Sequence, residues 1–250
     1  MSSLPSQNDS SPNDSPGLEI DDLIRIAQQN LRNEPDNVDM RAELAILYGW
    51  RGRATDAIRE FRTCLQQNPN NGRALMGYGQ FLFAQGNVDT AIEYLKRAGR
   101  SATDPQDQIL ALAVLGAAYR IDGNRHGAIV IWKALADPRH RSIVGISADF
   151  CLGIAYLEGG RVADALSQFK LVSSQTTHED DGGYIGRFSK TALALGKDQL
   201  SSWPKFPTTR EMLDIYVNLA WGIGGYVMNE QMVRRLNELT LELLTPDIPT

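Results

Sequence analysis

The sequence predicts an all-α chain, a solenoid of helical hairpins with an additional helical region at its C-terminal end. The first observation is a glycine that recurs at positions 52, 86, 123 and 160, at intervals of 34, 37 and 37 residues. The second is an alanine that follows each glycine by five residues, at positions 57, 91, 128 and 165. A fixed period of this length is typical of stacked helical repeats.

Each repeat has the pattern of two helices joined by a tight turn. In the first repeat Leu44 and Tyr48 recur at helical spacing and form one apolar stripe. Gly52 ends that helix, because glycine readily adopts the left-handed conformation that closes a helix C-terminus. Ala57 and Phe61 form the inner stripe of the second helix. One such hairpin cannot bury its apolar face alone, so we expect neighbouring hairpins to stack.

The motif that repeats is L-[AG]-x-x-[YL], then glycine, then A-x-x-x-[FWL], then proline, and it resembles the tetratricopeptide repeat family. In residues 38–71 the resemblance is carried by Leu44, Ala45, Tyr48, Gly52, Ala57, Phe61 and Pro69. Arg41 and Leu75 stand where the family usually has an early tryptophan, and the third and fourth repeats are three residues longer. The resemblance covers about residues 38–173. It implies a right-handed superhelix that binds other proteins.

The remaining elements are assigned in order along the chain. Residues 1–17 offer almost no apolar side chains, so we expect a disordered tail. Residues 18–33 form a helix that packs on the first repeat, as a capping helix or as half of a degraded repeat. The four repeats are placed at about 38–71, 72–105, 109–143 and 146–173. Residues 174–250 form a C-terminal helical region that completes or caps the array, with helices expected at 184–196, about 208–221 and 229–244.

Composition excludes several classes of protein. The net charge of −5 disfavours nucleic acid as a partner. The two cysteines, Cys64 and Cys151, lie on helical stripes, so we expect buried thiols rather than a disulfide framework. The N-terminal region lacks a basic stretch followed by an apolar core, so no signal peptide is expected. The longest uncharged run, 215–229, is too short to span a membrane. These features predict a cytoplasmic chain without a transmembrane segment.

No catalytic or metal-binding pattern stands out. His178-Glu179-Asp180-Asp181 groups an imidazole with three carboxylates, but contiguous side chains point in different directions and no second histidine follows at a ligand interval. Arg139-His140-Arg141 falls in a loop between repeats. We therefore expect no catalytic residues, no metal and no cofactor.

The resemblance implies that the first helix of each repeat lines the concave side of the array. We identified the positions of the first repeat that face the concave side and transferred them to the other repeats. The protein-binding residues predicted in this way are Ile46, Trp50, Met76, Gln80, Phe83, Leu110, Arg120, Phe150, Ile154 and Leu157. The same registers hold Ala42, Arg73, Ala113 and Ala117. Relatives that grip a terminal carboxylate have lysine and asparagine where this chain has Ala42 and Ile46. We therefore expect an apolar groove and no carboxylate clamp.

These expectations favour a non-enzymatic adaptor or scaffold that holds an apolar or amphipathic segment of a partner protein. Bacterial secretion or assembly chaperones are one class of such proteins. The alternative is a self-assembling structural protein whose residues 208–250 mediate homo-oligomerisation. A third hypothesis, an enzyme whose site lies within 174–250, would need His178 and neighbouring acids around a substrate or metal. The sequence leaves open whether the chain's own C-terminal helices fill the groove.

Overall fold

The computed structural model describes residues 20–137, 139, 146–176 and 183–202, and every regular element in these ranges is a helix. This confirms the all-α prediction. The helices are α1 (Ile20–Asn33), α2 (Val38–Trp50), α3 (Ala54–Gln67), α4 (Gly72–Ala84), α5 (Val88–Ser101), α6 (Pro105–Ile121), α7 (Arg125–Leu135), α9 (Ser147–Glu158), α10 (Val162–Gln175) and α11 (Gly183–Ser202). The expected tail at 1–17 and the helices expected at 208–221 and 229–244 lie outside the described residues.

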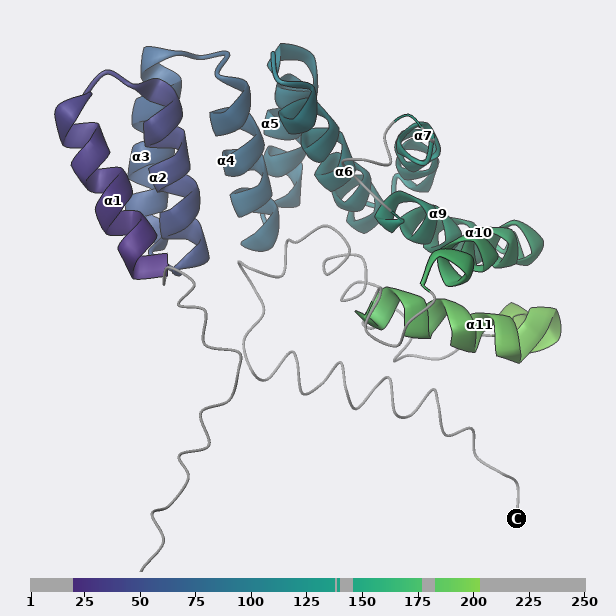
Figure 1. Ribbon diagram of the computed structural model, residues 1–250. Helices are drawn as coiled ribbons and strands as arrows, with labels where there is room; N and C mark the ends of the chain where they lie inside the picture. Colours follow the sequence, from purple (N-terminus) through teal and green to yellow (C-terminus); the bar gives the residue numbers. More distant parts are fainter. Residues whose placement is uncertain (1–19, 138, 140–145, 177–182, 203–250) are drawn as a thin grey trace, which may run out of the picture.

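The helices pair into hairpins that stack into a curved array, as the solenoid prediction requires (Figure 1). The pairs α2–α3, α4–α5, α6–α7 and α9–α10 pack within themselves, and each pair then contacts the next. In Figure 1 the helices at the N-terminal end stand upright, while α9, α10 and α11 at the opposite end run roughly horizontally, so the array turns along its length.

The turn inside each hairpin depends on a glycine with positive φ. Gly52 has φ 78°, and its N–H donates to the carbonyl of Gly49 at 3.0 Å. Arg53 N–H then donates to the carbonyl of Tyr48 at 2.8 Å. These two bonds form a Schellman motif, which satisfies the last carbonyls of α2. The same glycine conformation recurs at positions 86, 123 and 160.

The hairpin core pairs one small residue with one large residue. Trp132 of α7 is fully buried against Gly116 of α6, and a Cβ atom added at Gly116 would lie 2.4 Å from the indole Nε1. Phe169 meets Gly153 in the same way, at 2.7 Å from an added Cβ atom. A side chain larger than hydrogen at these glycines would push the aromatic ring away.

Helix α11 takes the position of the first helix of a fifth repeat. It bends at Gly196, which has φ 71° and follows Gly160 by 36 residues. The buried Ser189 precedes Gly196 by seven residues, as Gly153 precedes Gly160. The sequence pattern predicts a helix here but outside the repeats, because serine replaces the small Gly or Ala of that register and leaves no recognisable motif.

Helix α1 covers the N-terminal end of the array by packing on α2. Gln28 Nε2 donates to the hydroxyl of Tyr48 at 2.7 Å, and Arg51 pairs with Asp21 at 2.8 Å. Ile24 and Ala27 of α1 are buried in the same hydrophobic core as α2.

Candidate protein-binding face

The first helices of the repeats form the inner layer of the curve. Helix α2 contacts α4, and α4 contacts α6, whereas the second helices pack mainly against the first helices of their own and the following repeat. Because the first helices approach one another more closely, the array bends with α2, α4 and α6 on its inner side. We call the exposed side of these first helices the inner face.

The structure buries most of the predicted binding residues. Trp50 is 45% exposed, and Gln80 and Leu110 are partly exposed. The other seven are buried: Ile46, Met76, Phe83, Arg120, Phe150, Ile154 and Leu157. The ten residues are therefore not brought together in one open groove.

Contacts with neighbouring helices explain the burial of Ile46 and Phe150. A Cβ atom added at Gly77 of α4 would lie 2.7 Å from the side chain of Ile46, so the missing side chain lets Ile46 pack on the neighbouring helix. At the other end Phe188 of α11 meets Phe150 edge-to-face, with ring centroids 5.5 Å apart. Phe188 also meets Phe169 at 5.5 Å. Helix α11 thus covers part of the apolar surface of α9 as the next helix of the stack.

Arg120 joins two helices instead of facing solvent. Its guanidinium forms two bonds with the carboxylate of Glu158, at 2.8 and 2.7 Å, and only 3% of its side chain is exposed. A two-bond pair of this kind is both strong and geometrically specific. It links α6 to α9 across the step between the third and fourth repeats, where the connection between hairpins is long.

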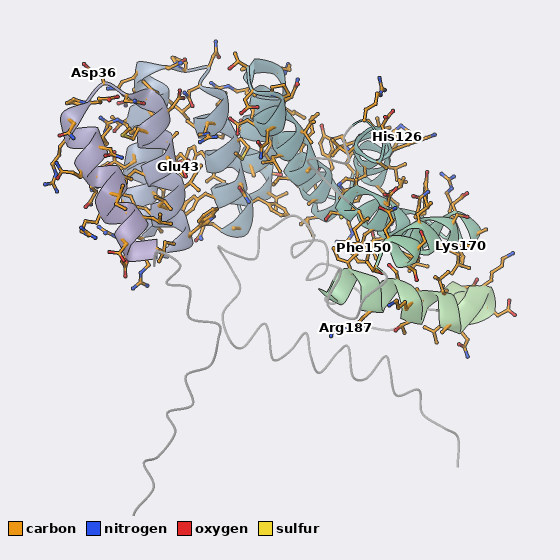
Figure 2. The ribbon with its side chains drawn as sticks, viewed as in Figure 1. Asp36, Glu43, His126, Phe150, Lys170 and Arg187 are labelled. Atoms are coloured by element: carbon orange, nitrogen blue, oxygen red, sulfur yellow. The ribbon has the colours of Figure 1, made fainter. Side chains whose placement is uncertain are left out.

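The accessible part of the inner face lies toward the N-terminal end. We define the inner patch as Glu43, Trp50, Arg73, Gln80 and Leu110, which come from α2, α4 and α6 and are all partly or fully exposed. Figure 2 labels Glu43 in this region, between the ribbons of α2 and α4. The patch combines an indole, an aliphatic side chain, an amide and two opposite charges.

Arg73 organises the charges of the inner patch. Its guanidinium lies 3.0 Å from Glu43 on α2 and 3.6 Å from Asp107 on α6, so one cation connects three neighbouring helices. Asp39 accepts a hydrogen bond of 2.6 Å from Asn71, the residue that caps α4. Three carboxylates therefore surround one guanidinium, and the region carries net negative charge.

Burial raises the pKa of Asp107, with further upward contributions from Asp104 and Asp39 and an opposing contribution from Arg73. Burial penalises the ionised form of a carboxyl, and nearby carboxylates add repulsion. Sequence analysis assigned Arg73 to the lining but missed Glu43 and Asp107. The signal that could have indicated these contacts with Arg73 is the presence of opposite charges at adjacent positions of successive first helices.

The described residues contain no group of three or more metal-ligating side chains and no helix long and apolar enough to cross a membrane. His126 is exposed at the start of α7, where Figure 2 labels it. The His178-Glu179-Asp180-Asp181 segment lies outside the described residues.

Residues 50–115 match the family model for the tetratricopeptide repeat. This part of the chain therefore carries tetratricopeptide repeats. The match spans the turn and second helix of the first repeat, the whole second repeat and most of α6, and the helices on both sides continue the same arrangement. Such repeats generally serve as scaffolds for protein–protein interaction. No curated protein matches the chain.

Among solved structures, the crystal structure of MamA is similar to this chain. It is 23% identical in sequence, with a TM-score of 0.49, and the likeness covers 71% of this chain and 92% of that chain. A likeness of this size says nothing about the partner or the role of the present protein.

Proposed function

We propose that this tetratricopeptide-repeat protein is a non-enzymatic adaptor that binds a segment of another protein on the inner patch. The observation that supports this most is the indole of Trp50, which is 45% exposed and lies about two turns along α2 from Glu43, the partner of Arg73. Exposed aromatic side chains next to charged groups are typical of protein-binding surfaces, because tryptophan and arginine contribute strongly to such contacts.

The chemistry of the patch suggests an amphipathic partner segment. Trp50 and Leu110 offer apolar area, while Glu43 and Asp107 leave an excess of negative charge around Arg73. A partner helix or strand with apolar residues on one side and a lysine or arginine on the other would use both features. The sequence predicts a wider apolar groove with ten lining residues. Seven of these ten are buried, so the proposed binding surface is smaller than that groove.

The adaptor proposal includes the narrower role of a secretion or assembly chaperone, which would shield an apolar segment until its partner is assembled. That role requires the bound segment to be aggregation-prone when free. Its test is a light-scattering assay in which the full chain keeps an identified partner soluble. Aggregation of the partner at the same rate with and without the chain would exclude the chaperone role and leave the adaptor role standing.

The adaptor role itself is tested by affinity purification from the native cell followed by quantitative mass spectrometry. We would compare the wild-type chain with a Trp50→Ala, Gln80→Lys variant and with the control Gln29→Lys on the exposed side of α1. The proposal expects specific proteins to be lost with the inner-patch variant and retained with the control. Retention of all of them by the inner-patch variant would contradict it.

The alternative of a self-assembling protein depends on residues 208–250, which lie outside the described part of the chain. Sedimentation velocity of the full chain, compared with a chain ending at residue 207, separates the two roles. Self-assembly would be favoured over the adaptor role by two results together. The full chain would form an oligomer that dissociates on truncation, and the inner-patch variant would lose no partner in the purification described above.

A further inference from the structure

The outer side of the array carries a row of basic residues with one member in every repeat. Each is the tenth residue after the turn glycine: Arg62 on α3, Lys96 on α5, Lys133 on α7 and Lys170 on α10. All four are exposed. We call these four residues the outer basic row. Figure 2 labels Lys170 on α10, on the outside of the curve.

The repeat architecture places the row on the outer side. Each member directly follows the large side chain that fills its hairpin, for example Lys133 after Trp132 and Lys170 after Phe169, both fully buried. A step of one residue turns a helix by about 100°, so the next side chain leaves the core. A shallow depression of about 380 Å³ runs along the same side of α3 and includes Arg59 and Arg62 in its lining.

The four cations of the row are unpaired within the described residues, unlike most other cations of the fold. Arg53, Arg59 and Arg161 all hold carboxylates within 3.1 Å. No member of the outer basic row forms an ion pair with any residue that the structure describes. The nearest approach to a partner is made by Lys96, whose ammonium lies 5.4 Å from the ring centre of Tyr119. Several other exposed basic residues, among them Arg32, Arg125, Lys190 and Lys197, also form no ion pair with the described residues. The row differs from them because it recurs at the same position of every repeat.

Two apolar side chains accompany the row. Val130 is 54% exposed and lies one helical turn before Lys133, and Leu171 is 42% exposed and follows Lys170 directly. They are two of the four large hydrophobic side chains exposed in the described ranges, the others being Ile26 and Trp50. The outer side of the third and fourth repeats thus combines cations with exposed apolar surface.

We propose that the outer basic row binds an extended acidic peptide segment of a partner protein, one that carries apolar residues among its carboxylates. Charge complementarity selects an anionic ligand, and Val130 and Leu171 select one with apolar side chains. A peptide can follow the curved side from repeat to repeat, whereas a flat bilayer would touch a convex surface over only part of the row.

The charges between the members of the row disfavour nucleic acid. Glu93 on α5 and Asp164 on α10 are also exposed on these helices, so the positive charges are spaced and interrupted. Duplex DNA carries one negative charge per roughly 1.7 Å of its axis and would meet these carboxylates. A peptide with carboxylates at wider intervals avoids them. The proposed site is independent of the inner patch, since it occupies the second helices and the inner patch occupies the first.

The test uses the full chain and a fluorescein-labelled peptide of repeated Glu, Ser and Leu residues, with binding followed by anisotropy at low salt. The row variant is Arg62→Glu, Lys96→Glu, Lys133→Glu and Lys170→Glu. The matched control reverses four exposed basic residues elsewhere, with the same change in net charge: Arg32→Glu, Arg125→Glu, Lys190→Glu and Lys197→Glu. Circular dichroism verifies that both variants keep their helices.

We expect the row variant to weaken peptide binding roughly tenfold or more, while the control stays within about threefold of wild type, because exposed pairs act locally. A separate Val130→Ser, Leu171→Ser variant should also bind the peptide more weakly than wild type, and its affinity should depend on salt concentration in the same way as that of wild type. Absence of binding by the wild-type chain, or equal loss in both charge variants, would overturn the proposal. So would a stronger, row-dependent affinity for phosphatidylglycerol vesicles or for single-stranded DNA of the same length.

Discussion

The packing of Trp132 against Gly116 provides the most direct test of how the two helices of a hairpin are held together. An alanine at position 116 would place its Cβ atom 2.4 Å from Nε1, 2.8 Å from Cε2 and 2.9 Å from Cδ1 of the indole. The ring is fully buried, so it cannot swing away without moving its neighbours. Overpacking of a well-filled core costs about 1–3 kcal/mol. The gain in helix propensity from glycine to alanine offsets about 0.5–1 kcal/mol.

We therefore expect Gly116→Ala to lower the free energy of unfolding by about 1–2 kcal/mol, the difference between these two contributions. Urea denaturation followed by circular dichroism at 222 nm measures this change. The control is Gly159→Ala, where an added Cβ atom meets its nearest neighbours at an ordinary 3.4 Å. That change should stay within about 0.5 kcal/mol of wild type.

A second substitution tests the reason as well as the size of the effect. Phenylalanine at position 132 removes the indole nitrogen, which has no hydrogen-bond partner in the described structure, and reproduces the Ala45–Phe61 arrangement of the first repeat. The Gly116→Ala, Trp132→Phe double variant should be more stable than the sum of the single changes by about 1 kcal/mol. Strict additivity, or a Gly116→Ala protein as stable as wild type, would refute the steric explanation.

Four further predictions follow from single residues. Gly196→Ala should destabilise the array by about 1–3 kcal/mol, because φ 71° with ψ −177° is a glycine-only conformation, and chemical denaturation measures the change. Glu158→Gln should cost about 2 kcal/mol by removing a carboxylate that forms two bonds with the buried Arg120 guanidinium; a change below about 0.5 kcal/mol, the size of an ordinary surface effect, would contradict this. Cys64, whose pKa is raised to about 11 by burial and by Asp39, should react with a disulfide reagent at pH 8 far more slowly in the native than in the unfolded chain, and equal rates would argue against burial. The raised pKa of Asp107 means that the folded state holds this proton more tightly than the unfolded state. Stability should therefore rise as pH falls through the folded pKa, and Asp107→Asn should flatten that part of the pH profile measured by thermal unfolding.

The repeat pattern made the fold predictable from sequence, because it records contacts that every hairpin must make. Gly52 and its equivalents are needed for the positive φ of the turn, and Ala57 and Phe61 for the packing between the two helices. These requirements are local, so they appear at fixed spacing. Helix α11 escaped the pattern because Ser189 replaces the small Gly or Ala of that register, although Gly196 keeps the glycine with positive φ.

The binding face was harder to predict, because exposure depends on neighbouring helices that sequence spacing does not describe. The register assigned Ile46 and Phe150 to the inner side, but Gly77 lets α4 approach Ile46 and Phe188 covers Phe150. Glu43 and Asp107 reach the inner face through their contacts with Arg73, and no motif marks such contacts. The position of a residue on a helix could be predicted, whereas the distance to the next helix could not.

Site-specific photocrosslinking tests most directly whether partners bind the inner face. A photoreactive phenylalanine analogue placed at Gln80, on the inner patch, and at Gln29, on the exposed side of α1, would report which surface a partner touches in the native cell. The proposed function predicts a discrete crosslinked protein from position 80 that is absent from position 29. Crosslinks of equal yield and pattern from both positions, or none from position 80, would contradict it.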